Sequence, residues 1–177
     1  MNDKGMPDLR INGERLISSI REMGAVGFDP ETGGRTRLAL TDADKKGRDL
    51  LCRRMHEEGL DVKIDPIGNI FGVREGTDSS ELPLMVGSHI DTVRDAGMFD
   101  GAYGVLGGLE VIRTLNENNV RTNKPLAVAA FTNEEGARFQ PDMMGSLYYT
   151  GTVCLEKLLS AKDDIGLTVG EELDRIG

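Results

Sequence analysis

The chain has 177 residues, of which 38% are hydrophobic and 29% charged, and its formal net charge at pH 7 is -9. This length and composition are typical of one folded domain and exclude disordered or fibrous proteins. No stretch gathers Lys and Arg, so we expect no nucleic-acid partner. No apolar run approaches the roughly 20 residues that cross a bilayer, and the polar start lacks a signal-peptide core, so we expect a cytoplasmic protein without membrane contact.

Two amphipathic helices are predicted in the first third of the chain. Asn12 can cap a segment, 13–23, whose apolar residues form one stripe on a helix. Residues 26–37 contain three glycines and a proline, which favour an irregular connection. Thr41 can cap a second helix, which we expect to end at Gly59.

The middle of the chain predicts a hairpin followed by a β-α-β unit. The hairpin strands, 62–64 and 69–73, flank a turn at 65–68. Two apolar runs, 84–88 and 125–131, are typical of strands buried on both faces.

A helix is predicted between those two strands, at 102–118. Its residues Gly104, Gly107 and Gly108 would permit close approach by neighbouring elements. A strand, a helix and a second strand in this order predict an α/β fold.

The last third predicts two more helices, at 153–161 and after Thr168, where Glu171 completes a capping box. The cysteines, Cys52 and Cys154, lie far apart and outside any CxxC pattern, so we expect two thiols, with a single disulfide as the alternative.

Residues whose side chains can bind metals or transfer protons follow the two apolar strands, 84–88 and 125–131. His89 and Asp91 follow the first, Asp100 lies on the next loop, and Glu134 and Glu135 follow the second. Open α/β sheets bind ligands at such strand ends. In an extended segment Asp91 can reach back and orient the ring of His89. Asp100 can bridge two cations, and the adjacent glutamates diverge, so that one can bind a metal while the other faces an activated water.

Each of these residues alone also has a purely structural interpretation. His89 could be a hydrogen-bonded core histidine, Asp91 and Asp100 could be turn residues, and the glutamates could belong to a solvated loop. Together, at the ends of two strands that should be neighbours, they indicate a metal site.

The surrounding motifs carry a family resemblance over nearly the whole chain. They are Arg37-Leu38-Ala39-Leu40-Thr41-Asp42, Gly47-Arg48-Asp49, Gly68-Asn69, Gly87-Ser88-His89-Ile90-Asp91-Thr92, Asp100-Gly101-Ala102-Tyr103-Gly104-Val105 and Asn133-Glu134-Glu135-Gly136-Ala137-Arg138-Phe139. In this order they resemble the amidohydrolase branch of the M20 metallopeptidase family, which contains N-carbamoyl-L-amino-acid hydrolases, β-ureidopropionases and allantoate amidohydrolases.

The resemblance implies a zinc-exopeptidase-like catalytic domain, an α/β fold with a mixed, largely parallel sheet flanked by helices, of which residues 1–177 would form the N-terminal portion. It implies that His89 and Glu135 each bind one of two divalent ions, that Asp100 bridges them, that Glu134 is the general base and that Asp91 orients His89. Zinc or manganese is expected, with cobalt or nickel as alternatives. The expected substrate is a small ureido or carbamoyl compound.

One departure from the family pattern concerns histidines, because the pattern needs two more after Glu135 and the chain has only His56 and His89. His56 lies in a charged helical segment, where a solvated histidine is expected. The lid domain through which the family forms homodimers is also absent, so we expect this piece alone to lack activity. The alternatives are a peptidase or deacylase of the same family and a truncated, non-catalytic remnant.

Overall fold

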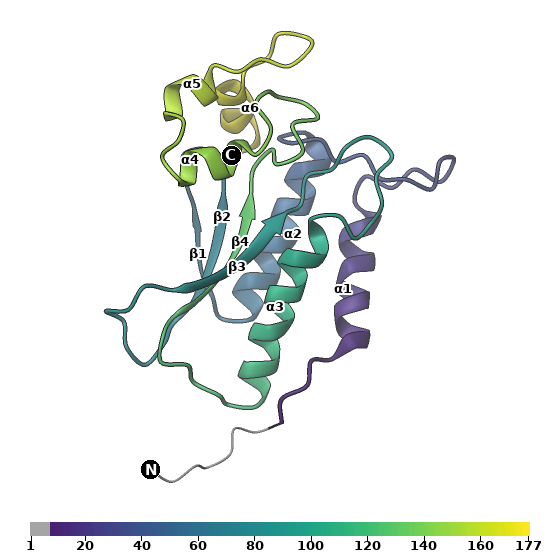
Figure 1. Ribbon diagram of the computed structural model, residues 1–177. Helices are drawn as coiled ribbons and strands as arrows, with labels where there is room; N and C mark the ends of the chain where they lie inside the picture. Colours follow the sequence, from purple (N-terminus) through teal and green to yellow (C-terminus); the bar gives the residue numbers. More distant parts are fainter. Residues whose placement is uncertain (1–7) are drawn as a thin grey trace.

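The computed structural model describes residues 8–177, and these form six helices and one four-stranded sheet (Figure 1). In chain order the elements are α1 (Gly13–Ala25), α2 (Asp42–Glu57), β1 (Asp61–Ile64), β2 (Ile70–Arg74), β3 (Leu84–His89), α3 (Ala102–Glu117), β4 (Leu126–Phe131), α4 (Met144–Tyr149), α5 (Leu155–Leu159) and α6 (Val169–Ile176).

The helix starts follow the capping residues of the sequence. The Asn12 side chain accepts the Arg15 N–H at α1, and the Thr41 side chain accepts the Asp44 N–H at α2. At α6, Thr168 and Glu171 form the capping box that was predicted. Each cap satisfies N–H groups that have no partner within the helix, so these three predictions are confirmed.

The sheet is mixed, with the strand order β1-β2-β4-β3. The β1–β2 hairpin is antiparallel, β2 pairs antiparallel with β4, and β4 pairs in parallel with β3. The predicted hairpin and β-α-β unit are therefore confirmed. The expectation of a largely parallel sheet is wrong for the described strands, because their parallel part is limited to one of the three pairings.

Helices α1, α2 and α3 lie on one face of the sheet, and the main core lies between them and the strands (Figure 1). Two glycines bring α3 close to β3. A Cβ atom on Gly104 would lie 2.8 Å from Ser88 Cβ, and one on Gly108 would lie 2.8 Å from Val86 Cγ1. A Cβ atom on Gly107 would meet nothing within 4 Å, so its predicted role in close packing is wrong.

The two strands of the β-α-β unit differ in burial. Residues 127–130 of β4 are buried, as predicted. The prediction that β3 is buried on both faces is wrong, since Leu84 and Val86 are 67% and 50% exposed. β3 is an edge strand of the described sheet, and an apolar run does not distinguish an edge strand from a central one.

A second core joins the last three helices to the segment before α2. Its buried side chains are Ala39, Leu40, Ile67, Phe139, Met144, Leu158, Val169 and Ile176. Helix α5 is shorter than the predicted 153–161, and α4 was not predicted. α4 follows Met143, which has a φ of 51° and makes no side-chain cap hydrogen bond, so its start carries no capping signal.

His56 is exposed on α2, and Cys52 and Cys154 are free thiols, as expected. Within residues 8–177, no helix combines the length and apolar character needed to cross a membrane.

Candidate metal centre

The carboxyl ends of β3 and β4 bring the predicted site residues together. The two strands run parallel with His89 opposite Phe131, so the residues that follow each strand emerge at the same edge of the sheet. His89 and Asp91 are both only 4% exposed. Glu134 and Glu135, which come after β4, are half-buried.

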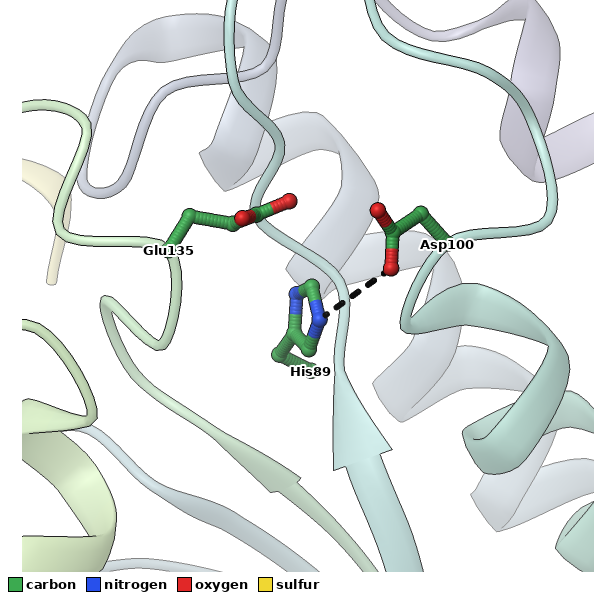
Figure 2. A group of neighbouring side chains, drawn as sticks. All are labelled: His89, Asp100 and Glu135. Carbon is green, nitrogen blue, oxygen red and sulfur yellow. Dashed lines mark ion pairs between the residues drawn. The ribbon is translucent and has the colours of Figure 1, made fainter.

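Three side chains lie where they could hold a metal ion. His89, Asp100 and Glu135 each offer one ligand atom, and these atoms all lie within 4.8 Å of one another. Figure 2 shows the carboxylates of Asp100 and Glu135 reaching from opposite sides toward the His89 ring. His89 Nε2 lies 3.8 Å from Asp100 Oδ1, too far for a hydrogen bond.

The donor set fits a divalent cation. Oε1 of Glu135 is buried and has no hydrogen-bond partner in the described structure. Burying an unpaired carboxylate oxygen is costly, and coordination would satisfy it. One imidazole and two carboxylates are ligands suited to zinc, manganese, cobalt or nickel.

The fourth predicted residue of the set, Glu134, lies against the same histidine. Its Oε2 is 3.3 Å from His89 Nε2, and its side chain is 35% exposed. This carboxylate therefore borders the three-residue cluster and is partly open to solvent.

The main chain of Asp91 sets the orientation of the His89 ring. His89 Nδ1 lies 2.9 Å from the Asp91 carbonyl oxygen. A carbonyl only accepts, so Nδ1 is the donor in this hydrogen bond, and Nε2 is the ring nitrogen that faces the cluster. The Asp91 carboxylate is 3.8 Å from Nδ1 and accepts the backbone N–H groups of Glu134 and Glu135 instead, each at 3.3 Å.

The electrostatics of the cluster favour a bound cation. Burial, with the nearby Asp44 carboxylate, raises the pKa of Asp91 to about 6. Burial also raises the pKa of Glu135, to which the negative charges of Asp100 and Glu134 contribute. A positive ion held by Asp100 and Glu135 would offset both the desolvation of Glu135 and its repulsion by the neighbouring carboxylates.

Gly101 allows the Asp100 loop to pass close to His89. It precedes α3 with φ 60° and ψ -53°, and a Cβ atom there would lie 2.5 Å from both His89 Cε1 and the His89 carbonyl oxygen. Only glycine leaves this space free, so Gly101 determines how near Asp100 can come.

Sequence reasoning missed the role of Arg37, which is 2% exposed and contacts the residues next to Asp91. Its Nε donates to the Ile90 carbonyl at 2.6 Å, and its backbone N–H donates to Thr92 Oγ1 at 2.8 Å. Arg37 thus holds the residues on both sides of Asp91. Arg37 lies in a segment that was expected to be irregular. Its place at the start of the motif 37–42 was the only feature of the sequence that could have indicated its role.

The motif indicated no structural role for Asn133, which directly precedes the two glutamates. Asn133 has a φ of 51°, and its side-chain amide donates to the carbonyls of Phe139 and Pro141 at 2.8 and 3.1 Å. Asn tolerates positive φ better than most residues, so an asparagine directly after a strand was a usable signal for the tight turn.

Comparisons with known proteins agree with this fold. The chain is 45% identical over 168 residues to the N-carbamoyl-L-amino-acid amidohydrolase of Rhizobium meliloti, a match that covers 95% of this chain and 40% of that protein. It is 34% identical over 135 residues to allantoate deiminase 1 of Glycine max, covering 75% of this chain and 28% of that protein.

A solved structure of a hydantoinase/carbamoylase family amidase from Burkholderia multivorans matches with a TM-score of 0.94 and 49% identity, over 97% of this chain and 41% of that one. The chain therefore spans about two fifths of the length of these bacterial relatives. The names confirm the resemblance to amidohydrolases of carbamoyl amino acids and allantoate.

The family model that matches the chain is described as Peptidase family M28. The motif resemblance had instead suggested the M20 metallopeptidase family. The M28 model covers residues 69–165, more than half of the chain, and this range contains every residue of the candidate metal centre. By this match the chain belongs to peptidase family M28, and within it is similar to the hydantoinase/carbamoylase amidases.

Proposed function

We propose that this chain is the N-terminal, metal-binding portion of the catalytic domain of an amidohydrolase that cleaves a ureido C–N bond. The observation that carries the proposal is the convergence of His89, Asp100 and Glu135 within 4.8 Å, with Glu134 beside them. The names of the relatives support an N-carbamoyl amino acid or an allantoate-like compound as the substrate.

In the proposed centre His89 and Glu135 would each hold one of two divalent ions, zinc or manganese, and Asp100 would hold both. When bound, such ions polarise a substrate carbonyl and lower the pKa of water to about 7. Asp100 suits a bridging role because its side chain is 65% exposed and free to present both oxygens.

Glu134 acts as the general base in this proposal. Its carboxylate accepts a proton from the attacking water and delivers it to the leaving nitrogen, so that one ureido C–N bond breaks and a carbamic acid is formed. The carbamic acid then loses carbon dioxide and frees the second nitrogen, so that the overall products are the amine, ammonia and carbon dioxide. The main chain of Asp91 keeps the proton of His89 on Nδ1, which supports Nε2 as the ligand atom.

Two alternatives remain. The family description favours a peptidase or deacylase, which would use the same residues on a different C–N bond. The second alternative is a non-catalytic product, because three ligands shared between two ions leave each ion under-coordinated.

Joining this chain to the remaining portion of the Rhizobium meliloti relative tests the proposal. The fusion, loaded with zinc or manganese, should release ammonia from N-carbamoyl-L-amino acids or allantoate and leave dipeptides intact. Glu134→Gln should reduce the rate by at least about 100-fold while binding metal as before.

The reverse preference, for dipeptides, would favour the peptidase alternative. A folded, metal-loaded fusion that hydrolyses neither class would contradict the proposal. We expect no turnover from residues 1–177 alone.

A further inference from the structure

The loop of residues 133–143, which carries the two glutamates, is held together by hydrogen bonds between its own residues. Besides the two hydrogen bonds of the Asn133 amide, the Met143 N–H donates to the Glu134 carbonyl at 2.8 Å, and the Gln140 side chain donates to the Gly136 carbonyl at 2.8 Å. These hydrogen bonds link the middle of the loop to its first residues, so a contact that fixes the middle also restrains Glu134 and Glu135.

Arg138 lies at the tip of this loop and is almost buried, with 11% of its side chain exposed. Its guanidinium pairs with Asp163 at 3.1 Å and with Glu172 at 2.7 Å, and it donates to the Ala39 carbonyl at 3.0 Å. The group also lies over the ring of Phe139, 4.7 Å from the ring centroid. One side chain thereby joins the loop to three other segments.

The acidic partners of Arg138 are themselves fixed. Glu172, on α6, is also bound by Arg175 at 2.7 Å, and Arg175 donates to the Leu40 carbonyl at 2.8 Å. Asp163 accepts the backbone N–H groups of Ile165 and Leu167. The side chains of Asp163 and Glu172 are only 7% and 5% exposed, so the pairs are shielded from solvent.

We propose that Arg138 is a positioning residue for the metal centre, which holds the loop that carries Glu134 and Glu135 against α6 and the segment before α2. The proposal rests on the proposed function only for the identity of the ligands. Without the guanidinium, the buried carboxylates of Asp163 and Glu172 each lose one of their partners, and the loop loses its tether to Ala39. The planar fork of arginine reaches all three partners at once, which a lysine ammonium cannot do.

The test compares Arg138→Met and Arg138→Lys with Arg113→Met as a matched control. Arg113 is buried to a similar degree, at 7% side-chain exposure, and pairs at 2.8 Å with Glu58, the C-cap of α2, and at 3.1 Å with Ser19 on α1, neither of which carries a proposed ligand. Thermal unfolding of each variant provides the correction for general loss of stability.

Two measurements are made on the full chain of residues 1–177. The first is hydrogen exchange at the Glu134 and Glu135 amides, which donate to Asp91. The second is the affinity for zinc alone, by calorimetric titration. We expect Arg138→Met to accelerate exchange at both amides at least 10-fold and to weaken zinc binding about 10-fold. Arg138→Lys should lie between Arg138→Met and the native chain, and Arg113→Met should change neither quantity beyond its effect on stability.

Exchange at Glu134 and Glu135 that is equally fast in Arg138→Met and Arg113→Met, after that correction, would overturn the positioning role. If the native chain bound no zinc, the proposed metal site would fail, while the exchange measurement would still decide the role of Arg138.

Discussion

Replacing Gly101 by alanine tests how closely the Asp100 loop must approach His89. At φ 60° and ψ -53°, Gly101 has a backbone conformation that an L-residue rarely adopts. The new Cβ would lie 2.5 Å from His89 Cε1 and 2.6 Å from Nδ1, about 1 Å inside ordinary contact. Either the histidine ring or the Asp100 loop must therefore move.

Two costs determine the expected loss of stability. Backbone strain of this kind costs about 1–3 kcal/mol. Overpacking in a tightly packed site costs about 1–3 kcal/mol more. Together the free energy of unfolding should fall by about 2–6 kcal/mol, which for a chain of this size lowers the Tm by roughly 4–24 °C. Because His89 Nε2 would also shift, zinc affinity should fall by about 10-fold or more.

Differential scanning calorimetry and zinc titration measure the two effects, with Gly107→Ala as the control. Gly107 lies on α3, and a Cβ there meets nothing within 4 Å, so this change should raise stability by about 0.5–1 kcal/mol. If Gly101→Ala were as stable as Gly107→Ala and bound zinc with native affinity, the close approach of the Asp100 loop to His89 would not matter, and the reasoning would be refuted.

Asp100→Asn should weaken zinc binding at least 10-fold in titrations with little change in Tm, because the Asp100 side chain is 65% exposed; native affinity would exclude Asp100 as a ligand. The hydrogen bond from Arg175, reinforced by Arg138, holds the pKa of Glu172 below its usual range. Its stabilising contribution is therefore present above the unfolded pKa and lost as pH falls through the folded one. Glu172→Gln should flatten the acid-side loss of stability in urea unfolding, and an unchanged slope would contradict this. Phe139→Ala, at a fully buried position, should lower the free energy of unfolding by about 3–5 kcal/mol, and a cost below about 1 kcal/mol would show that the second core does not depend on this ring.

The sequence predicted the features that depend on neighbouring residues. Asn12, Thr41 and Thr168 cap helices because a capping side chain bonds an N–H group two or three residues ahead. The strand ends could also be found, because the apolar runs give way to polar residues at Ser88-His89 and at Thr132. Parallel pairing across a connecting helix then implied that these ends meet at one edge of the sheet.

Local patterns could not predict which strand lies at the edge. β3 and β4 are both short apolar runs, yet β3 pairs only with β4 among the described strands, while β4 pairs on both sides. Burial of a strand depends on which elements pack around it. No periodicity within the run of 84–88 contains that information.

In the candidate metal centre, too, some features follow from the sequence and others only from the tertiary structure. The sequence by itself determined the residue types and their places after two strands, and the motifs indicated the likeness to amidohydrolases of carbamoyl amino acids and allantoate. Only the tertiary structure decided that the Asp91 carboxylate holds the main chain of Glu134 and Glu135, and that Arg138 pairs with Glu172. Those partners lie 34 to 44 residues apart in the chain, and their meeting depends on strand register and helix packing, which no local segment encodes.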